Sequence, residues 1–304
     1  RDSSYNSEMT VPKSLRPVVS SPLSIKNSNY YRFLCKKPYY FLESIKYSQL
    51  LQLRPEPQAI NSPSTKVLEI LGLASPYVCL HVKEYDHLDI SYVQPRGVKN
   101  PASYQLLITR LKNCGLNVVA LGKDRFTLEL LERFGAIPYG ITPHQTVQND
   151  FDLINGCDFY IGNNSGPANV ALALRKPLLF LNFIGLADSL IYSPFALYLL
   201  KRIYDCHLGR VMTILELMQS EAFYHMDSRF FNSSKDKYVL IDNTENELLE
   251  AFDEFYAHFR LYKASKSYNF PLSVNQSNVL HRLAPEHCCM YFNRPVLAEA
   301  NFLS

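Results

Sequence analysis

Motifs that mark several nucleotide-binding and hydrolytic enzymes are missing from this chain of 304 residues. It contains no G-x-G-x-x-G fingerprint, no Walker A loop and no G-x-S-x-G nucleophile elbow. Their absence weakens assignment to dinucleotide oxidoreductases, P-loop nucleotidases and α/β-hydrolases. No run of 18 apolar residues is free of charge, so the sequence predicts no membrane-spanning helix. The net charge of +3 is too small to argue for a nucleic-acid partner.

Cysteine usage excludes two further kinds of site. The seven cysteines are scattered and none forms a C-x-x-C pair, so neither a zinc site nor a disulfide framework is indicated. Reduced, buried thiols in a reducing compartment are the favoured interpretation. The chain begins without Met and without an apolar signal core, and we expect a fragment or a processed chain.

The sequence does contain a regular alternation of apolar segments after residue 76. Residues 1–72 are polar, then rich in Tyr and Leu, then rich in proline, and we treat them as an N-terminal region with a linker. Residues 264–304 show no clear periodicity and are treated as a C-terminal tail. The expected strands are 77–82, 117–122, 136–140, 158–162 and 177–182, and the expected helices are 102–115, 124–135, 147–157, 167–176 and 246–263. This alternation predicts an α/β domain over 73–263, with a Rossmann-like, doubly wound parallel sheet covered on both faces.

Residues 162–167, "GNNSGP", hold more small polar residues than a strand-to-helix connection needs. In a doubly wound sheet, ligands bind beyond the carboxyl ends of the strands, where this segment is expected. Gly166 allows close approach of the backbone, and the first turn of the following helix offers unpaired N–H groups. Ser165 and Gly166 are therefore candidates for binding a phosphate or diphosphate. Alternatively, Ser165 only caps the helix, while Asn163 and Asn164 complete the turn.

A second polar group, "HVKE", follows the first predicted strand. Lys83 can neutralise a phosphate as a point charge, and either His81 or Glu84 can serve as a base. The alternative is a surface ion pair beside a satisfied core histidine. Arg96 and Asn100 lie in the long loop that follows, and they either contact phosphate and sugar or are solvated loop residues.

Two weaker signals have simple structural explanations. In "LGKDR", Gly122 either turns the chain or lines a cleft, and Asp124 is a suitable helix N-cap. In "DFD", Asp150 and Asp152 match a D-x-D pattern that can hold a metal ion. Because this pattern opens a predicted helix, we favour capping by aspartate and predict no metal site.

The order of these segments resembles a bacterial family of glycosyltransferases with a GT-B fold, distantly similar to heptosyltransferases. Its members carry a V-x-L-H-V-R-[DE] strand, an R-N element before a Tyr-containing helix, an L-G strand end, and a D-F-x-I-G-x-x-S-G loop followed by K-P-L. This chain has "YVCLHVKE", "RGVKNPASY", "VVALG", "DFYIGNNSGP" and "RKPLLFLN" in the same order. Lys83 stands where the family usually has Arg.

The resemblance implies two Rossmann-like domains that face each other across a cleft, with the nucleotide-sugar held by the carboxyl-terminal one. Residues 1–72 would be the remnant of an acceptor domain. Neither a metal nor a cofactor is implied, because side chains and a helix end neutralise the departing diphosphate. Carried onto this chain, the diphosphate site would contain Lys83, Ser165, Gly166, Asn164 and Arg96. Other donor contacts would come from Asn100, Gly122 and Asn163, and the catalytic candidates are Glu84 and His81.

The expected reaction is transfer of a sugar from a nucleotide-diphosphate sugar to a glycan or lipid-linked acceptor. The expected location is the cytoplasm, with peripheral association at the inner membrane face as an option. A sugar-nucleotide epimerase or a polysaccharide pyruvyl transferase could use the same diphosphate loop. A non-catalytic module that binds a glycan or a partner protein is the other alternative, favoured by Lys83 in place of Arg and by the short N-terminal region.

Overall fold

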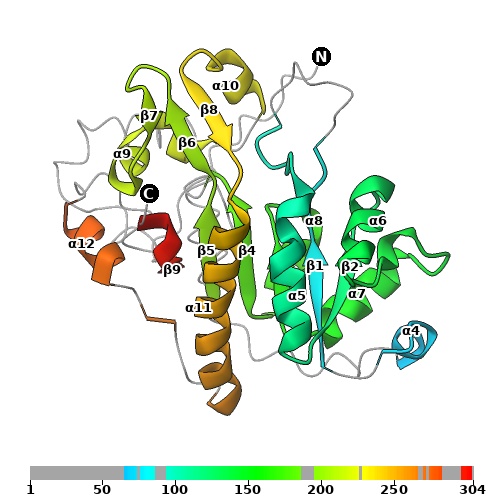
Figure 1. Ribbon diagram of the computed structural model, residues 1–304. Helices are drawn as coiled ribbons and strands as arrows, with labels where there is room; N and C mark the ends of the chain where they lie inside the picture. Colours follow the sequence, from blue (N-terminus) through cyan, green and yellow to red (C-terminus); the bar gives the residue numbers. More distant parts are fainter. Residues whose placement is uncertain are drawn as a thin grey trace, which may run out of the picture.

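A computed structural model of the chain describes residues 65–73, 76–85, 94–185, 195–225, 228–265, 270–271, 274–282 and 296–302 (Figure 1). The expectations for residues 1–64, including most of the proline-rich linker, fall outside this part of the chain.

A six-stranded parallel sheet forms the centre of the fold (Figure 1). In spatial order, its strands are β2 (Asn117–Leu121), β1 (Tyr77–His81), β3 (Tyr160–Gly162), β4 (Leu178–Phe183), β5 (Ala196–Leu200) and β9 (Val296–Leu297). Every neighbouring pair runs parallel. Apart from Asn117, all residues of these strands are buried, as expected where helices cover both faces of a sheet. Because β2 lies on one side of β1 and β3 lies on the other, the strand order reverses between β1 and β3.

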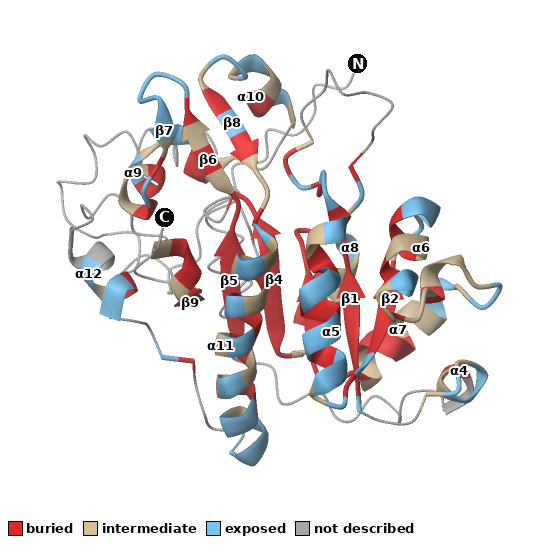
Figure 2. Cartoon of the chain, viewed as in Figure 1, coloured by how far each residue is buried: buried red, intermediate tan, exposed pale blue. Residues whose placement is uncertain are grey.

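Helices cover both faces of this sheet and enclose two apolar cores. One core is completed by α5 (Gln105–Asn113), α6 (Arg125–Arg133) and α11 (Glu245–Ala264), and the other by α4 (Thr65–Ile70), α7 (Val147–Gly156) and α8 (Gly166–Ala173). The buried side chains of α11 recur at spacings of three and four, which places one face of the helix on the sheet. Figure 2 shows the buried strands between helices whose outer faces are exposed. The doubly wound α/β architecture is confirmed.

A small antiparallel sheet follows the carboxyl end of β5. Its central strand, β6 (Arg202–Asp205), begins one residue after β5 and pairs with β7 (Arg210–Val211) and β8 (Tyr238–Ile241). The remaining elements are η3 (Pro101–Tyr104), η4 (Tyr139–Ile141), α9 (Ile214–Gln219), η6 (Glu221–Tyr224), α10 (Ser228–Ser233), α12 (Val274–Arg282) and η8 (Glu299–Phe302). Since β8 leads into α11, this sheet connects the last core strand to the long covering helix.

The strands predicted at 77–82, 117–122, 158–162 and 177–182 are confirmed to within two residues. The strand predicted at 136–140 is wrong. Ile137 makes a single parallel bridge to Val119, and the chain then enters η4. Pro138 explains the interruption, because its ring nitrogen carries no hydrogen with which to continue a ladder.

The prediction that an aspartate caps α7 is also wrong. The N-cap is Thr146, whose hydroxyl accepts a hydrogen bond from the Asn149 N–H. Asp150 and Asp152 lie within the helix, so the "DFD" segment begins one turn later than the sequence suggested. The N-cap predicted at Asp124 is confirmed, since its carboxylate accepts from the Thr127 N–H at 2.8 Å.

The C-terminal tail contributes to the main sheet, which the sequence did not predict. β9 pairs with β5 through Leu197 and Tyr198. The Gln276 side chain of α12 accepts a hydrogen bond from the Leu297 N–H at 2.9 Å and so fixes this short edge strand. The described part of the tail therefore packs against the same core as the predicted domain.

Candidate functional site

The two polar segments that the sequence singled out follow neighbouring strands. His81 ends β1 and Gly162 ends β3, and these residues are partners in the parallel register. Between these strands the order of the sheet reverses, which is the place where open α/β sheets bind ligands. The fold therefore brings "HVKE" and residues 162–166, here called the 162–166 loop, to one point on the carboxyl edge of the sheet.

His81 is almost completely buried at this point, with a relative exposure of 6%. Its Nδ1 atom has no hydrogen-bond partner within the described part of the chain. Burial lowers the pKa of the imidazole to about 4, opposed by the charge of Glu84 and assisted by that of Lys83. The ring is therefore neutral near pH 7. A buried, unpaired ring nitrogen is costly unless a ligand or water completes it, which makes His81 a candidate contact for a ligand.

Gly122 lies beside the His81 ring. A Cβ atom at position 122 would lie 3.6 Å from the ring Nε2 atom. The Gly122 backbone has a φ of 122°, a conformation that only glycine adopts readily. Gly122 thus turns the chain, as one of the two interpretations predicted, and it also borders the His81 ring.

The two asparagines of the 162–166 loop fasten that loop to the sheet. Asn163 accepts from the Lys83 N–H at 2.9 Å and donates to the Leu181 carbonyl at 2.8 Å. Asn164 donates to the Ile184 carbonyl at 2.9 Å and accepts from the Ile184 N–H at 3.2 Å. Both side chains are buried. This geometry favours a positioning role for Asn163 and Asn164 over direct contact with a donor.

In the same loop, Ser165 is half-buried and Gly166 is exposed. Ser165 occupies the N-cap position of α8, yet its side chain makes no capping hydrogen bond. Its hydroxyl instead lies 3.3 Å from the Tyr160 hydroxyl. Gly166 is exposed, and a Cβ atom there would meet nothing within 4 Å. The first turn of α8 therefore lacks the side-chain partner that an N-cap serine usually provides.

Tyr160 is a residue of this site that sequence reasoning missed. Burial raises the pKa of its phenol, which keeps the group protonated and able to donate to Ser165. A Cβ atom at Gly162 would lie 2.9 Å from the phenol oxygen and 2.8 Å from the His81 carbonyl oxygen, so glycine is needed to admit the phenol. In the sequence, Tyr160 is an aromatic residue within an apolar segment, and no neighbouring residue indicates that its hydroxyl contributes to a site.

The remaining predicted residues surround the exit of β1. Lys83 is half-buried, whereas Glu84, Arg96 and Asn100 are exposed. Residues 96–100, here called the 96–100 loop, run alongside this exit, because Val98 donates to the Lys83 carbonyl at 2.9 Å. The fold thus places the backbones of Lys83 and Glu84 against the loop that carries Arg96 and Asn100.

A polar cleft of about 560 Å³ opens beside Asn100. It lies between the start of η3 and the connection from β8 to α11, and its lining includes Asn100, Ser103, Gln105, Arg202 and Glu245. Asn100 is the residue that this cleft shares with the predicted site. Amide, hydroxyl, guanidinium and carboxylate groups in one lining suit a ligand rich in hydroxyl groups.

Within the described ranges, no group of three His, Cys, Asp or Glu side chains is placed to hold a metal ion. Asp150 accepts a hydrogen bond from Gln145 and Asp152 accepts one from Gln148. In the same part of the chain, no helix combines the length and apolar character that crossing a membrane requires.

Comparison with known proteins gives partial structural likenesses. No family model and no curated protein matches the chain. Escherichia coli ADP-heptose lipopolysaccharide heptosyltransferase II matches with a TM-score of 0.33 and 21% identity, over 48% of this chain and 40% of that one. The heptosyltransferase TibC, in complex with ADP-D-β-D-heptose, matches with a TM-score of 0.37 and 18% identity, over 62% and 46%. A family 9 glycosyl transferase from Veillonella parvula matches with a TM-score of 0.39 and 14% identity, over 64% and 50%. The chain thus spans half the length, or less, of these solved structures.

Proposed function

We propose that this chain is a glycosyltransferase that moves a sugar from a nucleotide-diphosphate sugar to a glycan or lipid-linked acceptor. The observation that carries the proposal is the meeting of the 162–166 loop and the buried His81 at the point where the strand order reverses. One segment offers an anion site and the other offers a neutral base. Direct displacement of a diphosphate by an acceptor hydroxyl uses both.

The diphosphate would lie at the start of α8. The N–H groups of the first helical turn and the positive end of the helix dipole attract negative charge. The Ser165 hydroxyl adds a donor, because it is not used for capping. Lys83 and Arg96 would supply positive charge from the exit of β1. Groups fixed in place before the reaction stabilise the charge that develops on a leaving diphosphate, and this term is commonly the largest one in catalysis. The mechanism we propose therefore uses no metal ion and no cofactor.

The reaction also requires a group that accepts the proton of the acceptor hydroxyl. An acceptor oxygen forms a bond to the anomeric carbon, and the bond from that carbon to the diphosphate oxygen breaks and leaves its electron pair on the diphosphate. The acceptor proton must pass to a base. His81 is one candidate for this base, because burial lowers its pKa to about 4 and the ring is unprotonated near pH 7. Glu84, which is exposed, is the second candidate for the base.

The cleft beside Asn100 would receive a sugar ring next to the diphosphate. Its polar lining can pair with hydroxyl groups through amide, guanidinium and carboxylate side chains. The partners of the chain would then be the nucleotide-sugar donor and a glycan or lipid-linked acceptor. We place the reaction in the cytoplasm, with peripheral association at the inner membrane face where the acceptor carries a lipid.

Calorimetric titration with uridine, guanosine and adenosine diphosphates is the first test. We expect one of them to bind, and Ser165→Ala and Lys83→Ala each to weaken it about tenfold, since hydrogen bonds to charged groups contribute about 1.5–3 kcal/mol. Arg133→Ala is the matched control, because this exposed arginine lies at the far end of α6.

Product analysis with labelled nucleotide-sugars then separates the reactions. Label in an acceptor glycan supports the proposal, whereas an epimerised free donor or a pyruvylated product contradicts it. If no nucleoside diphosphate binds and no label is transferred, the chain is a binding module and the proposal fails.

A further inference from the structure

A buried ion pair lies at the border of the proposed site, and one of its members, Asp242, also lines the cleft beside Asn100. Lys201, between β5 and β6, has a relative exposure of 3%, and its Nζ atom lies 2.6 Å from Oδ1 of Asp242. Burial lowers the pKa of this lysine, while the charge of Asp242 and its hydrogen bond raise it. Removing two charges from water often costs as much as their attraction returns, so stability alone is a poor reason to keep such a pair.

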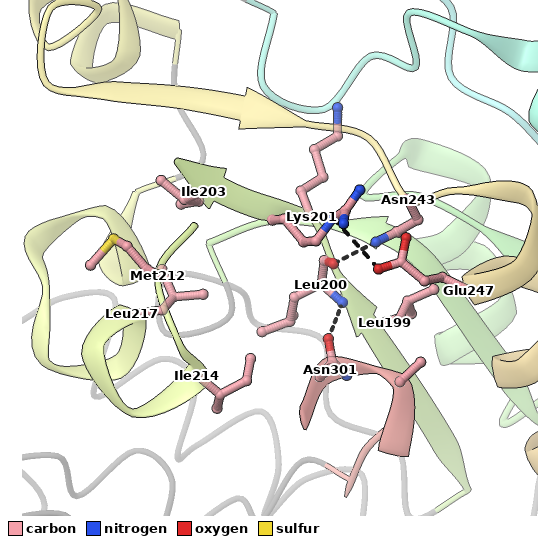
Figure 3. Close-up of a pocket in the computed structure, with 12 residues that line it drawn as sticks. Leu199, Leu200, Lys201, Ile203, Met212, Ile214, Leu217, Asn243, Glu247 and Asn301 are labelled. Carbon is pink, nitrogen blue, oxygen red and sulfur yellow. Dashed lines mark hydrogen bonds and ion pairs between the residues drawn. The ribbon is translucent and has the colours of Figure 1, made fainter. Parts of the chain in front are cut away.

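Both members of the pair hold the 96–100 loop. The Lys201 ammonium donates to the Gly97 carbonyl at 2.6 Å, and the second carboxylate oxygen of Asp242 accepts from the Lys99 N–H at 2.6 Å. Figure 3 shows the Lys201 side chain running away from the small cavity of about 20 Å³ that borders β5 and β6, not into it. The pair is therefore directed at the loop.

The opposite side of the 96–100 loop rests on the exit of β1. Val98 donates to the Lys83 carbonyl, and a Cβ atom at Gly97 would lie 2.8 Å from the Glu84 carbonyl oxygen. The loop is thus held between the segment that carries Lys83 and Glu84 and the Lys201–Asp242 pair. This contact leaves no room for a side chain at position 97.

The residue after Asp242 connects the same network to the 162–166 loop. Asn243 and Asn182 exchange hydrogen bonds at 2.8 Å and 2.6 Å, each donating its backbone N–H to the other's side-chain oxygen. Asn182 also donates to the Tyr104 hydroxyl at 3.2 Å. Burial raises the pKa of Tyr104, whereas the nearby Asn182 and Asn163 side chains lower it. Asn182 is held at a φ of 50°, an uncommon conformation for a residue other than glycine. One buried polar network therefore touches both loops.

We infer that the Lys201–Asp242 pair is a positioning device that sets the 96–100 loop, and with it Arg96 and Asn100, against the 162–166 loop. This inference rests on the proposed function, because it assigns Arg96 to the diphosphate. Asp242 belongs to the lining of the cleft beside Asn100, whereas Lys201 does not, and we assign neither to the diphosphate. They fix one side of a backbone segment whose other side rests on the exit of β1. Arg96 is therefore held near the anion before the donor binds.

The test uses the double variant Lys201→Met/Asp242→Asn. Neutralising both partners avoids a lone buried charge, and asparagine keeps an acceptor for the Lys99 N–H. The first measurement is amide hydrogen exchange. We expect the amides of Val98 and Lys99 to exchange at least about tenfold faster, as local opening becomes easier, while the amides of Val78 and Leu80 in β1 keep their protection.

The second measurement is a double-mutant cycle with Arg96→Ala, read as affinity for whichever of uridine, guanosine or adenosine diphosphate binds the native chain. In the native background, Arg96→Ala should lower the affinity for the diphosphate about tenfold. In the Lys201→Met/Asp242→Asn background, the same change should lower the affinity less than about twofold, because the released loop no longer holds the guanidinium near the diphosphate. If the pair only stabilised the fold, the double variant would bind the diphosphate less tightly, but Arg96→Ala would still lower the affinity by the same factor in both backgrounds. Lys201→Arg, which keeps the charge, should restore part of the coupling.

The outcomes separate this inference from the proposed function. If none of these diphosphates binds the native chain, the proposed function fails and the exchange data alone decide the inference. If the loop amides keep their protection in the double variant, or if Arg96→Ala costs the same in both backgrounds, the inference is overturned.

Discussion

The substitution Gly166→Ala offers a sharp test of the 162–166 loop, because it should change stability and ligand binding in opposite directions. The space around position 166 is open, since an added Cβ atom meets nothing within 4 Å. Gly166 is the first residue of α8. Alanine is favoured over glycine in helices by up to about 1 kcal/mol, so stability should stay level or rise. For a folded unit of about 200 residues, that gain would raise Tm by at most about 4 °C.

Binding should fall for a geometric reason. Each Cα–Cβ bond of a helix tilts toward the helix N-terminus, so the new methyl group stands where an anion would approach the first turn. Losing one hydrogen bond to a charged group costs about 1.5–3 kcal/mol, or roughly 10- to 100-fold in affinity. Calorimetry with the nucleoside diphosphate that binds the native chain measures this loss, and thermal unfolding measures the stability.

The control for this experiment is Ala173→Ser, which also adds one heavy atom to an exposed position of α8, at its other end. We expect it to leave affinity unchanged. A Gly166→Ala variant that binds within twofold of the native chain would refute the placement of the diphosphate at the start of α8. A variant that loses both stability and binding would refute the reasoning about open space.

Three further outcomes follow from the contacts described above. Tyr160→Phe should lower the free energy of unfolding by about 1 kcal/mol or less. It should also weaken diphosphate binding several-fold in calorimetry, because the Ser165 hydroxyl loses its neighbour, and unchanged binding would contradict a role for Tyr160 in positioning Ser165. Burial lowers the pKa of His81 from its ordinary value of 6.5 to about 4 in the folded chain, so below pH 6.5 the unfolded chain binds more protons than the folded one. Denaturant titrations should therefore show the free energy of unfolding falling by up to about 3 kcal/mol as the pH falls from 6.5 to 4, and His81→Gln should remove this pH dependence. Burial raises the pKa of Glu254 to about 7, with the charge of Glu299 acting in the same direction; stability should therefore fall as pH rises from 4.5 through 7, and Glu254→Gln should be the more stable protein at pH 8 in urea unfolding.

The sequence was sufficient to locate the first four strands of the main sheet and the edge at which their polar exits gather. Continuous apolar runs bounded by glycine or charge predicted β1 to β4, and a parallel sheet places their polar exits on one edge. The strand order was not predicted, because pairing between β1 and β3 depends on contacts between residues about 80 positions apart in the chain. β9 was missed for a related reason. A strand of two residues carries no periodicity, and Gln276 fixes it from a different helix.

The buried polar contacts could not be predicted at all. Tyr160 and Lys201 lie in apolar runs, where the local pattern indicates core packing for the tyrosine and a strand end for the lysine. Their partners, Ser165 and Asp242, become visible only after the chain has folded. Long-range hydrogen bonds leave no signal at fixed spacing in one sequence, whereas periodic burial does.

The four small residues that follow β3, Asn163 to Gly166, have two tasks. Asn163 and Asn164 point inward and pair with backbone groups of the β1 exit and of β4, so the loop is held at both ends. Ser165 is half-buried with its hydroxyl beside that of Tyr160, Gly166 is exposed, and neither makes a capping bond. An anion site needs both properties, since N–H groups that must not reorganise have to be fixed from behind and left open in front. A simple turn would need only the inward pair. Ser165 and Gly166 leave the start of α8 without a side-chain cap, and this favours a ligand as the explanation for "GNNSGP".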